Sequence, residues 1–133
     1  MTISLERFEL PEPVPNPKCE FYLFCDNDRS PVADFLGKLE NRDFDAFMVR
    51  LRTFAERGEI HDPSKYKAIQ SHEGIYEFKI WGWRLFCFHH RRKCILVEGC
   101  RKQSDRATNK NQAAYKRASS CRDKFLLYYT EEE

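Results

Sequence analysis

The chain has 133 residues, of which 33% are charged and 14% are aromatic, so it is long enough for one domain with a core of its own. No apolar run approaches the roughly 18 residues that a membrane-spanning helix needs. Residues 1–17 carry acids and prolines in place of the basic and apolar segments of a secretory signal. We therefore expect a cytoplasmic protein in which the six cysteines stay reduced.

The N-terminal part of the chain is expected to be extended. Between positions 11 and 17, prolines alternate with other residues, and proline cannot donate a hydrogen bond in the interior of a sheet. We predict an extended arm over residues 1–18 that lies outside the fold. The aromatic-rich run Glu20–Asp26 is the first predicted strand.

Two helices are predicted next. Ser30 is suited to the N-cap position, and Pro31 to the first helical position, of a short helix that ends at about Glu40. Between Phe44 and Ala55, apolar residues recur at the spacing of one helical face, and Gly58 is suited to the C-cap. This apolar stripe is predicted to form part of the core.

A meander of strands and a last helix complete the chain. The order indicates an α+β domain over residues 19–129, with two N-terminal helices packed on a twisted antiparallel sheet, a C-terminal helix after the last strand, and an acidic tail over residues 130–133. The remaining predicted elements are strands at Lys65–Gln70, Ile75–Trp81, from Arg84 onward and at Cys94–Gly99, and a helix that Thr108 or Asn109 caps.

The central hairpin is predicted from one glycine. Gly82-Trp83 is expected to form a two-residue type II′ turn, because glycine tolerates the positive φ of its first position. Trp81 would then pair with Arg84. Since directly opposed residues share a face of the sheet, we expect Lys79, Trp81 and Arg84 to lie together.

Positive charge is concentrated in the C-terminal third. From Arg84 to Lys124 there are twelve Lys and Arg against three Asp and Glu, a local net charge of +9, whereas residues 1–83 have a net charge of −4. Such a patch on and after a small sheet indicates recognition of phosphate groups, so a nucleic acid is the first partner to consider. The alternative is an ordinary solvated face.

One local group of residues suggests a metal site at first sight, namely Cys87, His89, His90 and Cys94. Their spacing, C-x-H-H-x3-C, differs from a C-x2-C knuckle, and no second pair follows at zinc-finger distance. Alternation along a strand also sends Cys87 and His89 to one face and His90 to the other. We therefore predict no metal site, and small buried cysteines instead.

A set of positions in the second half of the chain forms one pattern: Glu77-Phe78-Lys79, Arg84, Gly99-Cys100-Arg101-Lys102-Gln103-Ser104 and Asn109-Lys110. In this pattern the chain resembles the RelE/ParE toxin superfamily, in particular its HigB-like, phage-derived branch, and the resemblance covers about residues 19–129. In that branch Arg usually stands at the position of Lys79, Lys-Thr at Gln103-Ser104, and often Pro at Asn109.

The resemblance implies a toxin of a type II toxin–antitoxin pair. This branch is similar to mRNA endonucleases that act on the ribosome without a cofactor and are neutralised by a cognate antitoxin, for which we expect a helix-turn-helix protein. Two alternatives remain open. The ParE side of the superfamily inhibits DNA gyrase by binding it, and a non-catalytic RNA-binding module would use the same basic patch.

Cleavage without a metal ion uses the 2′-OH of the RNA as nucleophile, so the protein must move protons and neutralise the phosphate. Arg84 is the candidate for the phosphate, because its planar guanidinium matches two phosphate oxygens. Lys102 and Lys79 would add charge, and a lysine can act as acid or base if neighbouring cations lower its pKa. The candidates for RNA binding are Arg101, Gln103, Arg106, Lys110 and Trp81.

These residues also have structural interpretations. Arg84 and Lys79 are placed to pair with Glu77 or Glu98 as an ordinary cross-strand ladder. The tryptophans at positions 81 and 83 flank a turn, where they can cap the core or stack on a base.

Overall fold

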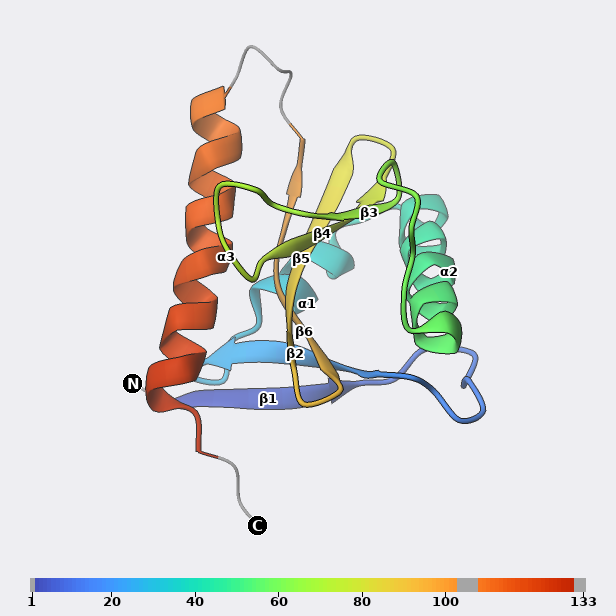
Figure 1. Ribbon diagram of the computed structural model, residues 1–133, viewed down its shortest axis with the longest axis horizontal. Coiled ribbons are helices and arrows are strands. Elements are labelled where there is room, and N and C mark those ends of the chain that lie inside the picture. Colours follow the sequence, from blue (N-terminus) through green and yellow to red (C-terminus); the bar gives the residue numbers. More distant parts are fainter. Residues whose placement is uncertain (1, 103–107, 131–133) are drawn as a thin grey trace.

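A computed structural model describes residues 2–102 and 108–130 of the chain. Over these residues it contains six strands and three helices (Figure 1). Among the helices of this described part, none has the length and apolar character to cross a membrane. The elements are β1 (Ile3–Phe8), β2 (Glu20–Asp26), α1 (Pro31–Gly37), α2 (Asn41–Arg57), β3 (Tyr66–Ala68), β4 (Tyr76–Ile80), β5 (Trp83–His90), β6 (Lys93–Arg101) and α3 (Thr108–Tyr128).

The strands form one mixed sheet in the order β1-β2-β6-β5-β4-β3. Four of the five neighbouring pairs are antiparallel, but β2 and β6 run parallel, with Phe21 opposite Cys94. The predicted antiparallel sheet beneath two N-terminal helices is therefore wrong. Parallel neighbours need a long crossover, and α1, α2 and the meander from β3 to β5 supply it between β2 and β6.

The arm predicted over residues 1–18 is also corrected. Residues 3–8 form β1, which pairs along its whole length with β2, and the Ile3 side chain is buried. The prolines stay outside the sheet, as their missing N–H requires, because positions 11–17 connect β1 to β2. The prolines thus mark a connection between two strands and not the end of the fold.

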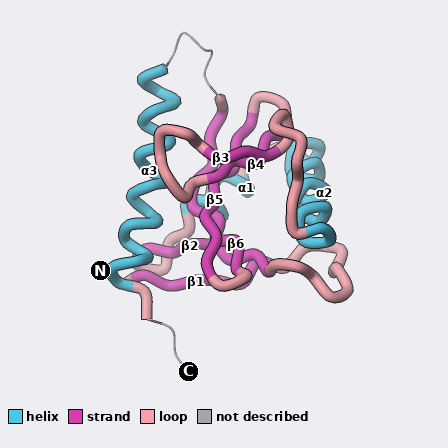
Figure 2. The backbone as a smooth tube through the Cα atoms, in the orientation of Figure 1, coloured by secondary structure: helices cyan, strands magenta, loops and turns pink. Residues whose placement is uncertain are grey.

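The helices divide into two layers with the sheet between them (Figures 1 and 2). Helices α1 and α2 cover one face, and α3 covers the other. Each face carries its own core. The first core includes Val32, Leu36, Phe47, Leu51, Phe54, Phe78, Leu85 and Leu96; the second includes Ile75, Phe86, Phe88, Ile95, Val97, Ala114, Ala118 and Phe125.

Local signals for the first two helices are confirmed. The Ser30 hydroxyl accepts a hydrogen bond from the Ala33 N–H at 3.0 Å, and Pro31 is the first helical residue. Helix α1 ends at Gly37, three residues before the predicted position. The predicted apolar stripe is the buried face of α2, which ends at Gly58 with a φ of 78°.

The β4–β5 turn consists of Trp81 and Gly82, one position earlier than predicted, and Trp81 itself takes a φ of 48°. Lys79 is therefore the partner of Arg84, where the prediction had paired Trp81 with it. This is a change of two residues in register. Because side chains alternate with a period of two, such a change leaves each strand residue on its predicted face.

Candidate functional site

Three cationic side chains gather around one buried carboxylate on the face that α3 covers. Lys79 Nζ lies 3.8 Å, and Arg84 Nε 3.6 Å, from Glu77 Oε1. Lys67 of β3 is the direct cross-strand partner of Glu77. We refer to Lys67, Glu77, Lys79 and Arg84 as the lysine–arginine cluster. It collects three positive charges from three neighbouring strands against one negative charge.

Arg84 anchors the β4–β5 turn. Its side chain is buried, and its Nη1 donates to the carbonyl oxygens of Trp81 at 2.7 Å and Trp83 at 2.8 Å. With the ion pair to Glu77, these contacts match the predicted structural alternative of a cross-strand ladder. The predicted role of Arg84 at a phosphate stays a prediction. Because Arg84 is buried, its positive charge would attract the phosphate from just beneath the protein surface.

Lys79 lies in surroundings that disfavour its positive charge. Its side chain is only 14% exposed. Burial lowers the pKa of Lys79 and the positive charge of Lys67 lowers it further, with a smaller contribution from Arg84, while Glu77 opposes the change. The net pKa is below the ordinary lysine value. A lower pKa reduces the cost of forming the neutral amine, which is the form that can accept a proton.

Glu77 carries an unusual carboxylate. Oε1 faces the two cations, whereas Oε2 is buried and has no hydrogen-bond partner among the described residues. Buried carboxylate oxygens without a partner are uncommon in folded proteins, because desolvation is costly. The cluster therefore holds an acceptor position that the surrounding described side chains leave unsatisfied.

A cavity of about 300 Å³ opens beside the cluster, between the segment after β3 and helix α3. Its lining includes Lys67 and Tyr115. The Tyr115 ring packs edge-on against Phe86, with centroids 5.7 Å apart, and lies 6.0 Å from the ring of His72. Burial raises the pKa of Tyr115, and the negative charge of Glu77 raises it further, so the phenol stays protonated at neutral pH.

Lys67 and Tyr115 were not predicted from the sequence as residues of this cluster and its cavity. Lys67 lies in a strand of only three residues with a weak pattern. Tyr115 lies on the helix side that packs on the sheet, and its nearness to Glu77 depends on which face α3 covers. The one signal available in the sequence was the alternation that put Glu77 and Lys79 on the same face.

The two tryptophans differ in their surroundings. Trp81 is 61% exposed, and the Arg42 guanidinium lies over its ring at 4.6 Å. Trp83 packs edge-on against Phe35, and its Nε1 donates to Asp43 at 3.2 Å. Trp83 thus caps the first core. Trp81 offers an exposed ring at the same end of the sheet as the lysine–arginine cluster.

Arg101 and Lys102 also lie at this end of the sheet. The Arg101 guanidinium lies over the ring of Trp83 at 5.2 Å, and the Lys102 N–H donates to the Gly82 carbonyl at 2.6 Å. Alternation along β6 assigns Lys102 to the face of Arg84 and Arg101 to the opposite face. The structure therefore brings Lys79, Arg84 and Lys102 to one end and one face of the sheet.

Three predicted RNA-binding residues have no described side chain. Gln103 and Arg106 lie outside the described residues. Lys110 belongs to the first turn of α3, but its side chain is outside the description. Their predicted roles stay predictions.

Comparison with known proteins identifies no family for this chain. No protein-family model, curated protein or solved structure matches this chain. The resemblance to RelE/ParE toxins therefore rests on the motif residues alone.

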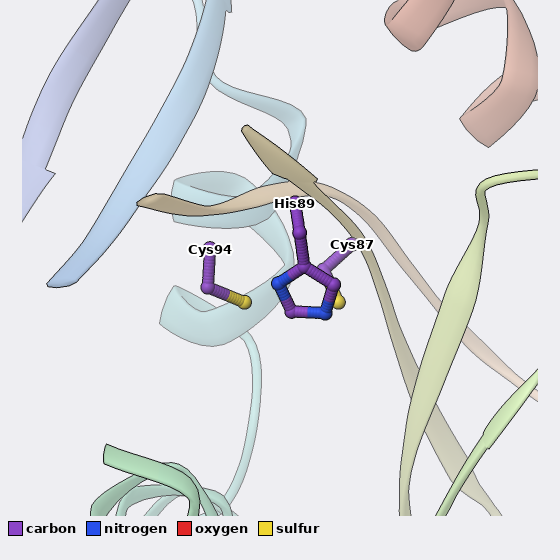
Figure 3. Close-up of side chains that lie close together, drawn as sticks. All are labelled: Cys87, His89 and Cys94. Carbon is purple, nitrogen blue, oxygen red and sulfur yellow. The ribbon is translucent and has the colours of Figure 1, made fainter. Parts of the chain in front are cut away.

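A second group of reactive side chains lies on the face that α2 covers. Cys87 and His89 of β5 and Cys94 of β6 point toward one another, and one ligand atom from each lies within 4.8 Å of the others (Figure 3). Both cysteines are fully buried, whereas His89 is exposed. The sequence spacing argued against such a group. Across the hairpin, however, His89 is the direct partner of Cys94, and Cys87 lies two residues earlier on the same face.

The surroundings of this group favour a thiolate at Cys87. Burial acts to raise the pKa of Cys87, but hydrogen bonds with Cys94 and His89 outweigh it and lower the pKa to about 6. Burial raises the pKa of Cys94, and the hydrogen bond with Cys87 and the negative charge of Cys87 raise it further. His90 points away from the group, since its ring packs against Phe125 of α3 at 5.0 Å, which confirms the predicted alternation. All six cysteines carry free thiols.

Proposed function

We propose that this chain is an endoribonuclease that cleaves mRNA on the ribosome without a metal ion, as the toxin of a type II toxin–antitoxin pair. The observation that carries the proposal is Lys79, a poorly exposed amine whose pKa is lowered by burial and by neighbouring cations. A lysine can act in proton transfer when its surroundings lower its pKa in this way. The proposal further rests on the resemblance in the residues from Glu77 to Lys110.

In the proposed reaction, the neutral amine of Lys79 accepts the proton of the RNA 2′-OH. The 2′-oxygen attacks the adjacent phosphorus, and the bond from phosphorus to the 5′-oxygen breaks, which leaves a 2′,3′-cyclic phosphate. The protonated amine of Lys67 gives its proton to the departing 5′-oxygen. Arg84 and Lys102 stabilise the negative charge that grows on the phosphate, an electrostatic contribution of the kind that dominates many enzymes.

Two neighbouring features suit a single-stranded RNA substrate. The cavity beside Lys67 and Tyr115, of about 300 Å³, has room for part of a nucleotide. Trp81 exposes an aromatic ring, and bases of single-stranded RNA stack on such rings with about 1–3 kcal/mol each. In this proposal the phosphate lies over the lysine–arginine cluster and a flanking base lies on Trp81.

The proposed partner is a helix-turn-helix antitoxin in the cytoplasm. We expect it to occlude the end of the sheet that carries Arg84, together with the segment 101–110, because a toxin must be kept harmless until it is released. Co-expression and pull-down with the neighbouring gene product tests this contact. Binding that survives charge reversal of both Arg84 and Lys102 would place the antitoxin elsewhere.

The decisive experiment is primer extension on mRNA from translating ribosomes incubated with the purified chain. Lys79→Arg is the test variant, and Lys65→Arg is the matched control, since Lys65 is an exposed lysine in the loop before β3. Cleavage by the wild type and by Lys65→Arg, but not by Lys79→Arg, supports the proposal. RNA binding without cleavage supports a binding module, and gyrase inhibition without cleavage supports a ParE-like toxin. Either result overturns the nuclease.

A further inference from the structure

We propose that Cys87, His89 and Cys94, completed by Cys19, form a binding site for a zinc ion. The three residues of the cluster supply two thiol sulfurs and one imidazole nitrogen, all within 4.8 Å of one another. In a tetrahedral zinc site with bonds of about 2.0–2.3 Å, neighbouring ligand atoms are about 3.5–3.8 Å apart. The cluster therefore needs a contraction of only about 1 Å.

The sheet register places a candidate for the fourth ligand on the same face as the cluster. Phe21 of β2 is the direct partner of Cys94 in the parallel pair, so both lie on the face that α2 covers. Cys19, two residues before Phe21, falls on the same face and is buried in the same core. The Cys19 sulfur lies outside the group of ligand atoms that are within 4.8 Å of one another, so the bend that carries Cys19 must move toward the cluster when the metal binds.

The histidine is already oriented as a metal ligand. Figure 3 shows one ring nitrogen of His89 directed at the Cys94 sulfur. The other, Nε2, shares a hydrogen bond of 2.6 Å with the Tyr66 hydroxyl. The ring also stacks on Phe54, with an interplanar angle of 11°. Zinc-bound histidines nearly always have such an outer partner on the second nitrogen, which fixes the ring and its tautomer.

The chemistry of this donor set selects the metal. Three thiolates and one imidazole form a closed, tetrahedral set that suits zinc, whereas magnesium and calcium prefer oxygen ligands. A cavity of about 260 Å³, lined by Cys19, Tyr66 and His89 among others, gives an entry path from solvent. Binding would displace the thiol protons, so that affinity increases with pH.

The proposed zinc site is separate from the proposed RNA site. The cysteines and His89 belong to the face that α2 covers, near the β5–β6 turn, while the lysine–arginine cluster lies on the α3 face near the β4–β5 turn. A zinc ion at Cys87 would tie β5 and β6 to the segment just before β2. We therefore expect it to stabilise the sheet without contacting RNA.

The test is titration of the full-length reduced protein with Co²⁺, whose absorption reports tetrahedral thiolate coordination, followed by competition with Zn²⁺. His89→Ala is the leading variant because His89 is exposed, so the substitution removes no buried side chain, and His90→Ala is its matched neighbour on the opposite face. For the buried thiols, Cys94→Ala is matched by Cys25→Ala, another buried cysteine.

We expect one equivalent of Co²⁺ with sulfur-to-metal charge transfer in the wild type, His90→Ala and Cys25→Ala. Tyr66→Phe should weaken Zn²⁺ binding by about ten- to a hundredfold, and His89→Ala or Cys94→Ala by more. Cys19→Ala should lower the charge-transfer intensity by about one third, since two of three thiolates remain. Absence of stoichiometric binding, or equal binding by His89→Ala and His90→Ala, overturns the site; an unchanged Cys19→Ala spectrum overturns the assignment of Cys19.

Discussion

Replacing Lys79 by arginine separates the positive charge of this side chain from its ability to give up a proton. An arginine at this position keeps a cation within reach of Glu77, which lies 3.8 Å from the lysine nitrogen. Its guanidinium stays protonated at every accessible pH. If Lys79 is the base of the proposed reaction, the variant keeps the positive charge of the site but can no longer accept the proton of the 2′-OH.

The expected loss is large compared with any effect on folding. A positioned acid or base contributes about 10²–10⁴-fold in rate, which corresponds to about 3–5 kcal/mol. Arginine keeps a positive charge beside the buried Glu77 carboxylate, so no charge is left without its partner, and we expect the free energy of unfolding to change by about 1 kcal/mol. RNA affinity, which depends mainly on charge, should stay within about twofold.

The pH profile gives an independent readout. Wild-type cleavage should increase as pH rises through the pKa of Lys79, because the neutral amine is the active form. Lys67→Gln removes the proposed acid, so it should lower the cleavage rate at every pH. It also removes a positive charge that disfavours protonated Lys79, so it raises the pKa of Lys79 and moves the increase in rate to higher pH. Primer extension at a series of pH values measures both. Undiminished cleavage by Lys79→Arg, or a profile that Lys67→Gln leaves in place, would refute the role of Lys79 as base.

Three further predictions concern the sheet. Glu77→Ala leaves the buried Arg84 without its carboxylate partner and should lower the free energy of unfolding, measured in urea, by about 3–5 kcal/mol. A loss below about 1 kcal/mol would show that hydrogen bonds to the backbone carbonyls are enough to hold Arg84 in place. Gly99→Ala places a methyl group into the ring of Phe35 and should cost about 1–3 kcal/mol in thermal melting, whereas unchanged melting would mean that the ring moves aside freely. Burial raises the pKa of Glu98 despite its pairing with Arg117, so its charged form disfavours folding. Wild-type stability should therefore fall as pH rises through that pKa, and less so for Glu98→Gln; parallel curves for the two proteins would contradict this.

Local signals in the sequence predicted much of the fold. The cap formed by Ser30 and Pro31 and the apolar stripe closed by Gly58 each depend on a few adjacent residues, and both are confirmed. The prediction that Lys79 and Arg84 share a face of the sheet was also correct, although the predicted register was wrong. A register change by an even number of residues leaves every side chain on its face.

Features that depend on distant pairing could not be predicted in this way. Alternation within β2 and β6 shows which side chains are buried but not which strands are neighbours or in which direction they run, so the parallel pair was missed. β1 was missed because the prolines that follow it dominated the composition of its segment. Both arrangements become visible only when one strand is placed beside its partner.

The same limit applies to the two candidate sites. The cluster of Cys87, His89 and Cys94 depends on the β5–β6 register, with its irregularity between Phe86 and Cys87. Zinc-knuckle spacing applies to ligands on one short loop, whereas these ligands come from two paired strands, so the spacing could not predict the cluster. For the RNA site, Lys79 and Arg84 were predictable from one hairpin, whereas Tyr115 comes from a helix that packs across the sheet.

The parallel pair has a consequence for how the chain folds as it is made. The inner edge of β2 has its partner in β6, roughly 70 residues later, so a growing chain cannot complete the sheet when β2 leaves the ribosome. At about 5–20 residues per second, this edge waits about 4–14 s with only β1 on its other side. Pairing over such a sequence separation is also slow in a free chain. The protein should therefore acquire its structure late in synthesis, when β6 and then α3 emerge, and chains truncated before β6 should be prone to aggregation.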